Sequence, residues 1–293
     1  MSLLVKIAGA LPISWVRFVS SLQFRIPGFG PVFQWAANRF RNQDLTIPRG
    51  AAKGLRFNSG NENAGYVLGT YEPEVQALLQ ELVTPGMTVY DVGAHVGFVS
   101  ILAAKLVGCG GRVVSFEPLA ENARQLTHNV RINGFQNVSV REEAAGSAHG
   151  VALLQVAAVL GHCKLASVGA VAGKTGELSV PVRSIDDLVS GGIIASPQFV
   201  KIDVEGAEDD VLAGMAGTIA LQKPLLLIEL HGTNVAIEKR LKSFNYQAVA
   251  LGTGLGFWKR LGTRRLLPSP GNRGCELAQD QVKAIQEPAP RKP

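Results

Sequence analysis

Between residues 87 and 230 the sequence alternates short apolar runs with longer amphipathic stretches, and this alternation restricts the fold more than any other feature. The apolar runs predict buried strands at 87–92, 112–117, 138–140, 197–203 and 224–230. Helical spacing lies between and after them, at 96–106, 119–133, 207–215 and 236–244. Such alternation is typical of an α/β fold with a doubly wound, mostly parallel sheet covered by helices on both faces.

The remaining segments complete this organisation. We expect a helix at 72–83, a β-rich insertion at 146–181, a short capped helix at 184–188, and an antiparallel closing pair of strands at 248–250 and 256–258. The chain then divides into an N-terminal helical extension at 1–60, a catalytic domain at 61–265 and a flexible tail at 266–293, which is rich in proline and charge.

The N-terminal extension is basic, since no acidic residue precedes Asp44 in a chain of formal charge +6. Its apolar residues recur at helical spacing with Lys6 and Arg17 among them. This pattern fits a helix packed on the domain, and it also fits a helix lying on a membrane surface. No apolar run reaches the ~20 residues that span a bilayer. Three scattered cysteines argue against a disulfide framework. We expect a cytoplasmic protein, with contact at the inner membrane face as an added hypothesis.

The turn after the first predicted strand indicates a ligand site. In a parallel sheet, ligands bind at the carboxyl ends of the strands. Gly93 and Gly97 allow a ligand to approach the backbone, and the following helix offers free N–H groups. Glu117 ends the second strand, where its carboxylate can accept both hydroxyls of a ribose. These features suit either a dinucleotide or S-adenosylmethionine.

Two details favour S-adenosylmethionine. The turn reads Gly-x-x-x-Gly and lacks the Gly-x-Gly-x-x-Gly spacing of dinucleotide sites. Asp91 also stands two positions before Gly93. A carboxylate there would repel a pyrophosphate but suits a ligand that carries an ammonium and a sulfonium. The predicted cofactor site takes its residues from the strand ends and from the segment before the first strand: Glu72, Asp91, Gly93, Ala94, His95, Gly97, Glu117, Pro118, Glu143, Ala144 and Asp203.

Several segments in order resemble the motifs of FkbM-type methyltransferases. They are Val89-Tyr90-Asp91-Val92-Gly93-Ala94-His95-Val96-Gly97, Phe116-Glu117-Pro118, Asn129-Val130-Arg131-Ile132-Asn133-Gly134, Lys201-Ile202-Asp203-Val204-Glu205-Gly206-Ala207-Glu208 and Ile228-Glu229-Leu230-His231. The resemblance covers residues 65–231. It implies a class I methyltransferase fold, S-adenosylmethionine as cofactor, and O-methylation of a sugar, a polyketide or another small hydroxylated molecule. His95 departs from the asparagine usual in the family.

Methyl transfer to a hydroxyl needs alignment of the acceptor and a group that accepts its proton. Asp203 ends the fourth strand and is our first candidate as base or anchor, followed by Glu205 and His231. Lys201 lies two positions earlier, on the same side of the strand, and can keep Asp203 ionised. A buried Lys201–Asp203 pair that only shapes the loop explains the same pattern. Asp203, Glu205, Glu229 and His231 are also metal donors, but they show no fixed-spacing motif, so we predict no metal.

Three other functions share parts of this pattern. A nicotinamide-dependent oxidoreductase has the same fold and ribose carboxylate, but not the Gly-x-x-x-Gly turn. A non-catalytic nucleoside-binding protein would keep the pocket without turnover. An RNA methyltransferase agrees with the positive charge, but aromatic residues are only 6% and no basic–aromatic platform stands out. We therefore expect a small-molecule or glycan acceptor and no specific nucleic acid; the oligomeric state is left open.

Overall fold

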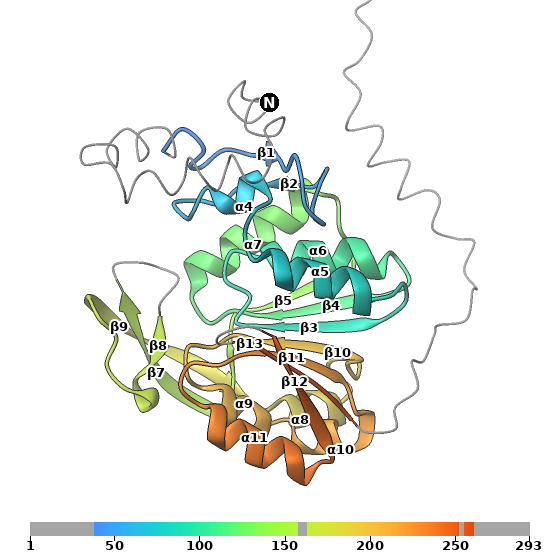
Figure 1. The fold of residues 1–293 in the computed structure, drawn as a ribbon. Helices are drawn as coiled ribbons and strands as arrows, with labels where there is room; N and C mark the ends of the chain where they lie inside the picture. Colours follow the sequence, from blue (N-terminus) through green and yellow to red (C-terminus); the bar gives the residue numbers. More distant parts are fainter. Residues whose placement is uncertain (1–37, 158–162, 252–254, 261–293) are drawn as a thin grey trace, which may run out of the picture.

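A seven-stranded sheet forms the centre of the molecule. The computed structural model describes residues 38–157, 163–251 and 255–260, so the predictions for 1–37 and for the tail lie outside the described residues (Figure 1). The strand order is β12-β13-β11-β10-β3-β4-β5; β13 pairs antiparallel with both β12 and β11, and the other neighbouring strands of this sheet pair parallel. The strands are β3 (Thr88–Val92), β4 (Arg112–Phe116), β5 (Val138–Arg141), β10 (Phe199–Ile202), β11 (Leu225–Glu229), β12 (Tyr246–Leu251) and β13 (Leu255–Arg260).

Helices cover both faces of this sheet (Figure 1). One layer contains α5 (Pro73–Leu82), α6 (Phe98–Val107) and α7 (Ala120–Ile132), and the other contains α8 (Ile185–Ser190), α9 (Glu208–Ala213), α10 (Ala216–Gln222) and α11 (Asn234–Ser243). Because side chains alternate along a strand, β3 contributes side chains to the hydrophobic cores on both faces of the sheet. Val89 packs with the first layer, while Tyr90 and Val92 pack with the second. The predicted doubly wound sheet and its antiparallel closing pair are confirmed.

The predicted insertion is a separate four-stranded sheet of order β6-β9-β7-β8. Its strands are β6 (Ala144–Ala145), β7 (Gly150–Ala157), β8 (Lys164–Leu165) and β9 (Lys174–Arg183), and a 3-10 turn, η2 (Ala166–Val168), follows β8. In Figure 1 β7, β8 and β9 project beyond the main sheet on the left of the view. This position lets the insertion form one wall of the site at the strand ends.

The short capped helix after the insertion is also confirmed. Ser184 precedes α8 and its hydroxyl accepts a hydrogen bond from the Asp187 amide at 3.3 Å. The helix α10 was not predicted. Asp186, 31 residues away, supplies its cap by accepting hydrogen bonds from the amides of Gly217 and Thr218, each at 2.7 Å.

The segment before the main sheet packs on α7. It contains β1 (Leu45–Thr46), β2 (Arg56–Phe57) and α4 (Gly65–Leu68). Asn129 of α7 and Asn133 at its C-cap bond to this segment through their side-chain amides. Each amide accepts a hydrogen bond from a backbone N–H and donates one to the carbonyl of the same residue, Asn58 for Asn129 and Arg56 for Asn133. Residues 56–58 are thereby fixed against this helix.

Two further findings concern the helices and the cysteines. Among the helices in the described part of the chain, none has both the length and the apolar character needed to cross a membrane. Cys109 is disulfide-bonded, whereas Cys163 is not. The scattered spacing of the cysteines therefore did not predict the redox state of both.

Candidate functional site

A cavity of about 420 Å³ lies at the carboxyl ends of the parallel strands. The strand order reverses between β3 and β10, and residues that follow both strands line the cavity. This is the place where doubly wound sheets bind ligands. Of the predicted site residues, those in the wall are Glu72, Gly93, His95, Glu117, Pro118, Ala144, Asp203 and Glu205.

The other predicted residues lie outside the wall. Asp91 is fully buried, and Lys201 is buried behind Asp203. Ala94 and Gly97 belong to the turn under His95, and His231 lies beyond Glu205. Glu143 is held by Arg141 and Arg183 and does not line the cavity.

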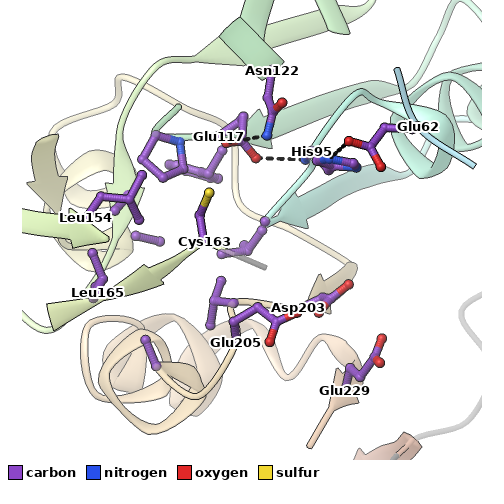
Figure 2. A pocket seen from close by; sticks show the side chains of 18 of the residues that line it. Glu62, His95, Glu117, Asn122, Leu154, Cys163, Leu165, Asp203, Glu205 and Glu229 are labelled. Carbon is purple, nitrogen blue, oxygen red and sulfur yellow. Dashed lines mark hydrogen bonds and ion pairs between the residues drawn. The ribbon is translucent and has the colours of Figure 1, made fainter. Parts of the chain in front are cut away.

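Glu117 is held in a fixed orientation on one side of the cavity (Figure 2). Its Oε2 accepts a hydrogen bond from the His95 amide at 2.8 Å, and its Oε1 accepts one from the Leu119 amide at 3.0 Å and one from Asn122 at 3.4 Å. Burial raises the pKa of Glu117, and these hydrogen bonds oppose that rise. The carboxylate can accept further hydrogen bonds, as recognition of a diol requires.

The turn between β3 and α6 needs glycine for reasons within the fold. Gly93 has φ +81°, and a Cβ there would lie 1.8 Å from the backbone oxygen of Asp203. Gly97 has φ +88°, and its Cβ would lie 2.6 Å from Leu126. Gly93 therefore lets the first loop lie directly against the loop after β10.

Asp91 sits under this turn with one oxygen unsatisfied. Ser100 donates a hydrogen bond to its Oδ2 at 2.6 Å, whereas Oδ1 is buried and has no partner among the described residues. Burial raises the pKa of Asp91, and the Lys201 ammonium opposes that rise. An unpaired buried oxygen is costly, so a bound ammonium or water at this position would be favourable.

His95 has a left-handed backbone, with φ +50°, and links the turn to the preceding segment. Its Nδ1 lies 3.4 Å from the Tyr66 hydroxyl, and its Nε2 lies 3.5 Å from Glu62 Oε1. Tyr66 also stacks on Tyr71, with ring centroids 3.9 Å apart. All of these side chains line the cavity.

Sequence reasoning predicted His95 in this wall but missed its other side chains, and it missed the apolar wall opposite. Glu62, Tyr66 and Tyr71 come from a segment that carries no strand-end signal. Leu154 and Leu165 come from the insertion, and Figure 2 shows them beside Cys163. Asn122 was detectable, since it lies in the first turn of the helix that follows Glu117.

The loop after β10 forms an acidic wall (Figure 2). Asp203 Oδ2 accepts a hydrogen bond from Lys201 Nζ at 2.8 Å. Burial disfavours the Asp203 carboxylate, but the adjacent Lys201 ammonium outweighs burial and holds its pKa below the usual value. Burial would lower the pKa of Lys201, but the carboxylates of Asp203, Asp91 and Glu72 raise it. The pair is therefore ionised.

His231 is held by a second buried pair. Its Nδ1 lies 2.9 Å from Glu208 Oε1, and Glu208 is fully buried and also accepts hydrogen bonds from Thr233 and from the Gly206 amide. The hydrogen bond to Glu208 raises the pKa of His231 to about 9. The imidazole is therefore cationic at neutral pH, with its Nε2 facing Glu205 at 3.8 Å.

Among the described residues, two carboxylates on this wall have no cation within hydrogen-bond distance, and His231 Nε2 lies 3.8 Å from Glu229. Burial raises the pKa of Glu72, and its Oε2 has no partner among the described residues. Burial and the charges of Asp203 and Glu72 raise the pKa of Glu229 to about 7. Donor atoms of Glu72, Asp203 and Glu229 lie within 4.8 Å of one another, as do those of Asp203, Glu205 and His231. The donors considered from the sequence thus converge, with Lys201 and His231 as the cations among them.

With this geometry in place, comparison with known proteins identifies the family. The model of the Methyltransferase FkbM domain matches residues 91–248, more than half of the chain. The chain belongs to this family. The match spans β3 to β12 and contains Asp91, Glu117, Asp203 and Glu229.

Individual relatives are more distant. The hexuronic acid methyltransferase AglP of Haloferax volcanii is 30% identical over 162 residues, which cover 55% of this chain and 62% of AglP. A methyltransferase FkbM structure from Methylobacillus flagellatus is similar with a TM-score of 0.44 and 18% identity, covering 68% of this chain and 55% of that one. An O-methyltransferase of Thermotoga maritima has a TM-score of 0.38 and 14% identity, covering 66% and 67%. The chain thus spans less than two thirds of AglP and of the Methylobacillus protein.

S-adenosylmethionine is the cofactor of this family, and the cavity fits it. The Glu117 carboxylate lines the cavity and would accept the hydroxyls of a ribose, and the unpaired Asp91 Oδ1, buried behind the wall, would suit an ammonium group. Because Gly93 has no Cβ, the loop after β3 lies directly against the loop after β10. When bound, the cofactor supplies a sulfonium whose methyl group is open to displacement.

Proposed function

We propose that this protein transfers a methyl group from S-adenosylmethionine to a hydroxyl group of a sugar, a glycan or another small hydroxylated molecule. The observation that carries the proposal is that one cavity holds Glu117 and, across from it, Asp203, Glu205 and Glu229 (Figure 2). Carboxylates accept hydrogen bonds from hydroxyl groups and can take their protons. The acidic wall is therefore suited to an acceptor rich in hydroxyls.

The charges on this wall favour a neutral acceptor. AglP is a hexuronic acid methyltransferase, which supports a sugar as acceptor. Within the described residues, however, the cations beside the acidic wall are already paired: Lys201 with Asp203, His231 with Glu208, and Lys164 with Glu205 at 3.9 Å. A carboxylate on the acceptor would meet like charges, with no unpaired cation among the residues of this wall that the structure describes. We therefore place neutral sugars ahead of sugar acids.

An acceptor screen tests the proposal. The full chain is incubated with methyl-labelled S-adenosylmethionine and matched neutral, acidic and amino sugars, and the products are identified by mass spectrometry. We expect label in an alkali-stable methyl ether of a neutral sugar. An alkali-labile methyl ester would contradict a hydroxyl acceptor. Tight cofactor binding without transfer to any member would instead favour a non-catalytic binding protein.

The nicotinamide-dependent alternative has a separate test. Family membership favours methyl transfer, and the unpaired Asp91 oxygen disfavours a pyrophosphate nearby. Calorimetry with S-adenosylhomocysteine and with NAD decides between the two. Binding of NAD without binding of S-adenosylhomocysteine would refute the proposed cofactor.

A further inference from the structure

Glu229 lines the cavity together with Asp203 and Glu205, but its side chain is more exposed than either of theirs. Its nearest cationic atom is His231 Nε2 at 3.8 Å, beyond hydrogen-bond distance. Within the described residues no donor reaches its carboxylate, and its side chain is 37% exposed. An acceptor in the cavity can therefore approach this carboxylate directly.

The alternative bases are already engaged. Asp203 accepts a hydrogen bond from Lys201 at 2.8 Å, and the lowered pKa of Asp203 makes it a poor proton acceptor. His231 donates from Nδ1 to Glu208 and carries its proton at neutral pH. Removal of the proton from an acceptor hydroxyl therefore requires a carboxylate that is not already held in a hydrogen bond.

The groups facing Glu229 explain why it suits this task. Glu72 precedes α5, Asp203 and Lys201 come from β10, and His231 follows β11. Glu72 and Asp203 each place an oxygen within 4.8 Å of Glu229, so two negative neighbours favour the protonated form. Lys201 and His231 oppose them only in part, and the pKa of about 7 that results is near the working range of a general base.

We propose that Glu229 is the catalytic base that takes the proton of the acceptor hydroxyl, and that Glu72 is a positioning residue that keeps Glu229 basic. This proposal rests on the proposed transfer to a hydroxyl. Asp203, held by Lys201, then serves as a fixed hydrogen-bond acceptor for the bound molecule.

The step balances in atoms and charge. As the acceptor's O–H proton passes to Glu229, its oxygen forms a bond to the methyl carbon, and the electron pair of the breaking carbon–sulfur bond stays on sulfur. The products are a methyl ether, an uncharged thioether and protonated Glu229. Because Glu229 is partly exposed, it returns the proton to solvent.

Substitutions in the full chain test the assignment. We expect wild-type kcat to rise with pH through about 7, the pKa of Glu229. Glu229→Gln should lower kcat by ~100-fold or more and abolish that rise, while the Kd for S-adenosylhomocysteine changes less than about threefold. Glu72→Gln should move the rise to lower pH. Glu238→Gln, in an exposed pair with Lys242, is the control that leaves the profile unchanged. A rise that survives in Glu229→Gln would overturn the proposal.

A second measurement does not need an acceptor. Wild-type protein labelled with ¹³C at glutamate carboxyls is titrated with S-adenosylhomocysteine bound, and Glu229 is assigned by the resonance missing in Glu229→Gln or Glu229→Asp. Titration near 7 supports the assignment, and titration near the ordinary glutamate value overturns it. A methyl ester in the acceptor screen would instead refute the hydroxyl acceptor, because a carboxylate has no proton to give at neutral pH.

Discussion

Single residues at the cofactor turn connect local backbone geometry to binding. Gly93 and Gly134 both have positive φ, +81° and +70°, so alanine at either is strained by ~1–2 kcal/mol. They differ in surroundings, since a Cβ at Gly134 meets nothing within 4 Å, whereas one at Gly93 would overlap the Asp203 backbone. Gly93 should therefore matter for the site as well as for stability.

We expect Gly93→Ala to weaken S-adenosylhomocysteine binding by ~10-fold or more, because the loop that carries Asp203 must move. Gly134→Ala should cost about 1 kcal/mol of folding free energy and leave binding unchanged. Calorimetry and urea unfolding of both variants measure the two effects. Equal binding by the two alanine variants would show that the contact between the loops has no role in the site.

The buried Glu208 offers a second comparison at this scale. Glu208→Gln keeps the shape but removes the charge that faces His231, so we expect the pKa of His231 to fall from about 9 by at least ~1 unit. Losing charged hydrogen bonds should also cost ~1.5–3 kcal/mol of stability. Asp209→Asn is the matched control on the same helix, because its pair with Arg240 is partly exposed and should contribute under ~1 kcal/mol. Histidine NMR titration measures the pKa of His231, and urea unfolding measures the free energy of unfolding. An unchanged pKa of His231 in Glu208→Gln would contradict this account.

At the scale of elements, α7 fixes the segment before the sheet. Asn129 is fully buried; it accepts from the Asn58 amide at 2.8 Å and donates to the Asn58 and Val96 carbonyls at 3.0 and 2.8 Å. Asn129→Ala should cost ~2–3 kcal/mol and speed amide exchange in residues 56–66. Asn137→Ala removes two hydrogen bonds to the end of α6 instead, and should leave that exchange unchanged. Equal amide-exchange rates in residues 56–66 of the two variants would show that Asn129 does not hold this segment in place.

The same elements show what sequence reasoning could reach. Strands and helices with strong periodicity were predicted to within a few residues, because burial on both faces leaves a plain apolar pattern. The alternation of a strand placed Lys201 beside Asp203, as the structure has it. Helix α10 was missed because its cap comes from Asp186 in another helix. Tyr66 and Tyr71 were missed because tertiary packing on α6, and no local pattern, brings them to the cavity.

At the scale of the whole molecule, the site makes stability depend on pH. In the folded state Glu229 has a pKa of about 7, against 4.5 for the free group, and His231 about 9 against 6.5. Both groups bind protons more tightly when the protein is folded. Each group therefore contributes its full stabilisation of the folded state below its free pKa, and this stabilisation is lost as pH rises through its folded pKa. Burial raises the pKa of Glu117 and Asp91 in the same direction.

We therefore expect the free energy of unfolding to fall between pH 5 and pH 9. Glu229 should account for ~1 kcal/mol of the loss up to pH 7, after allowance for its exposure, and His231 for ~2 kcal/mol between pH 7 and 9. Urea unfolding at pH 5, 7 and 9 measures both steps. Glu229→Gln should flatten the first step alone and His231→Gln the second. Wild-type stability that rises from pH 5 to 9 would contradict this account, because tighter proton binding by the folded state can only lower stability as protons become scarce.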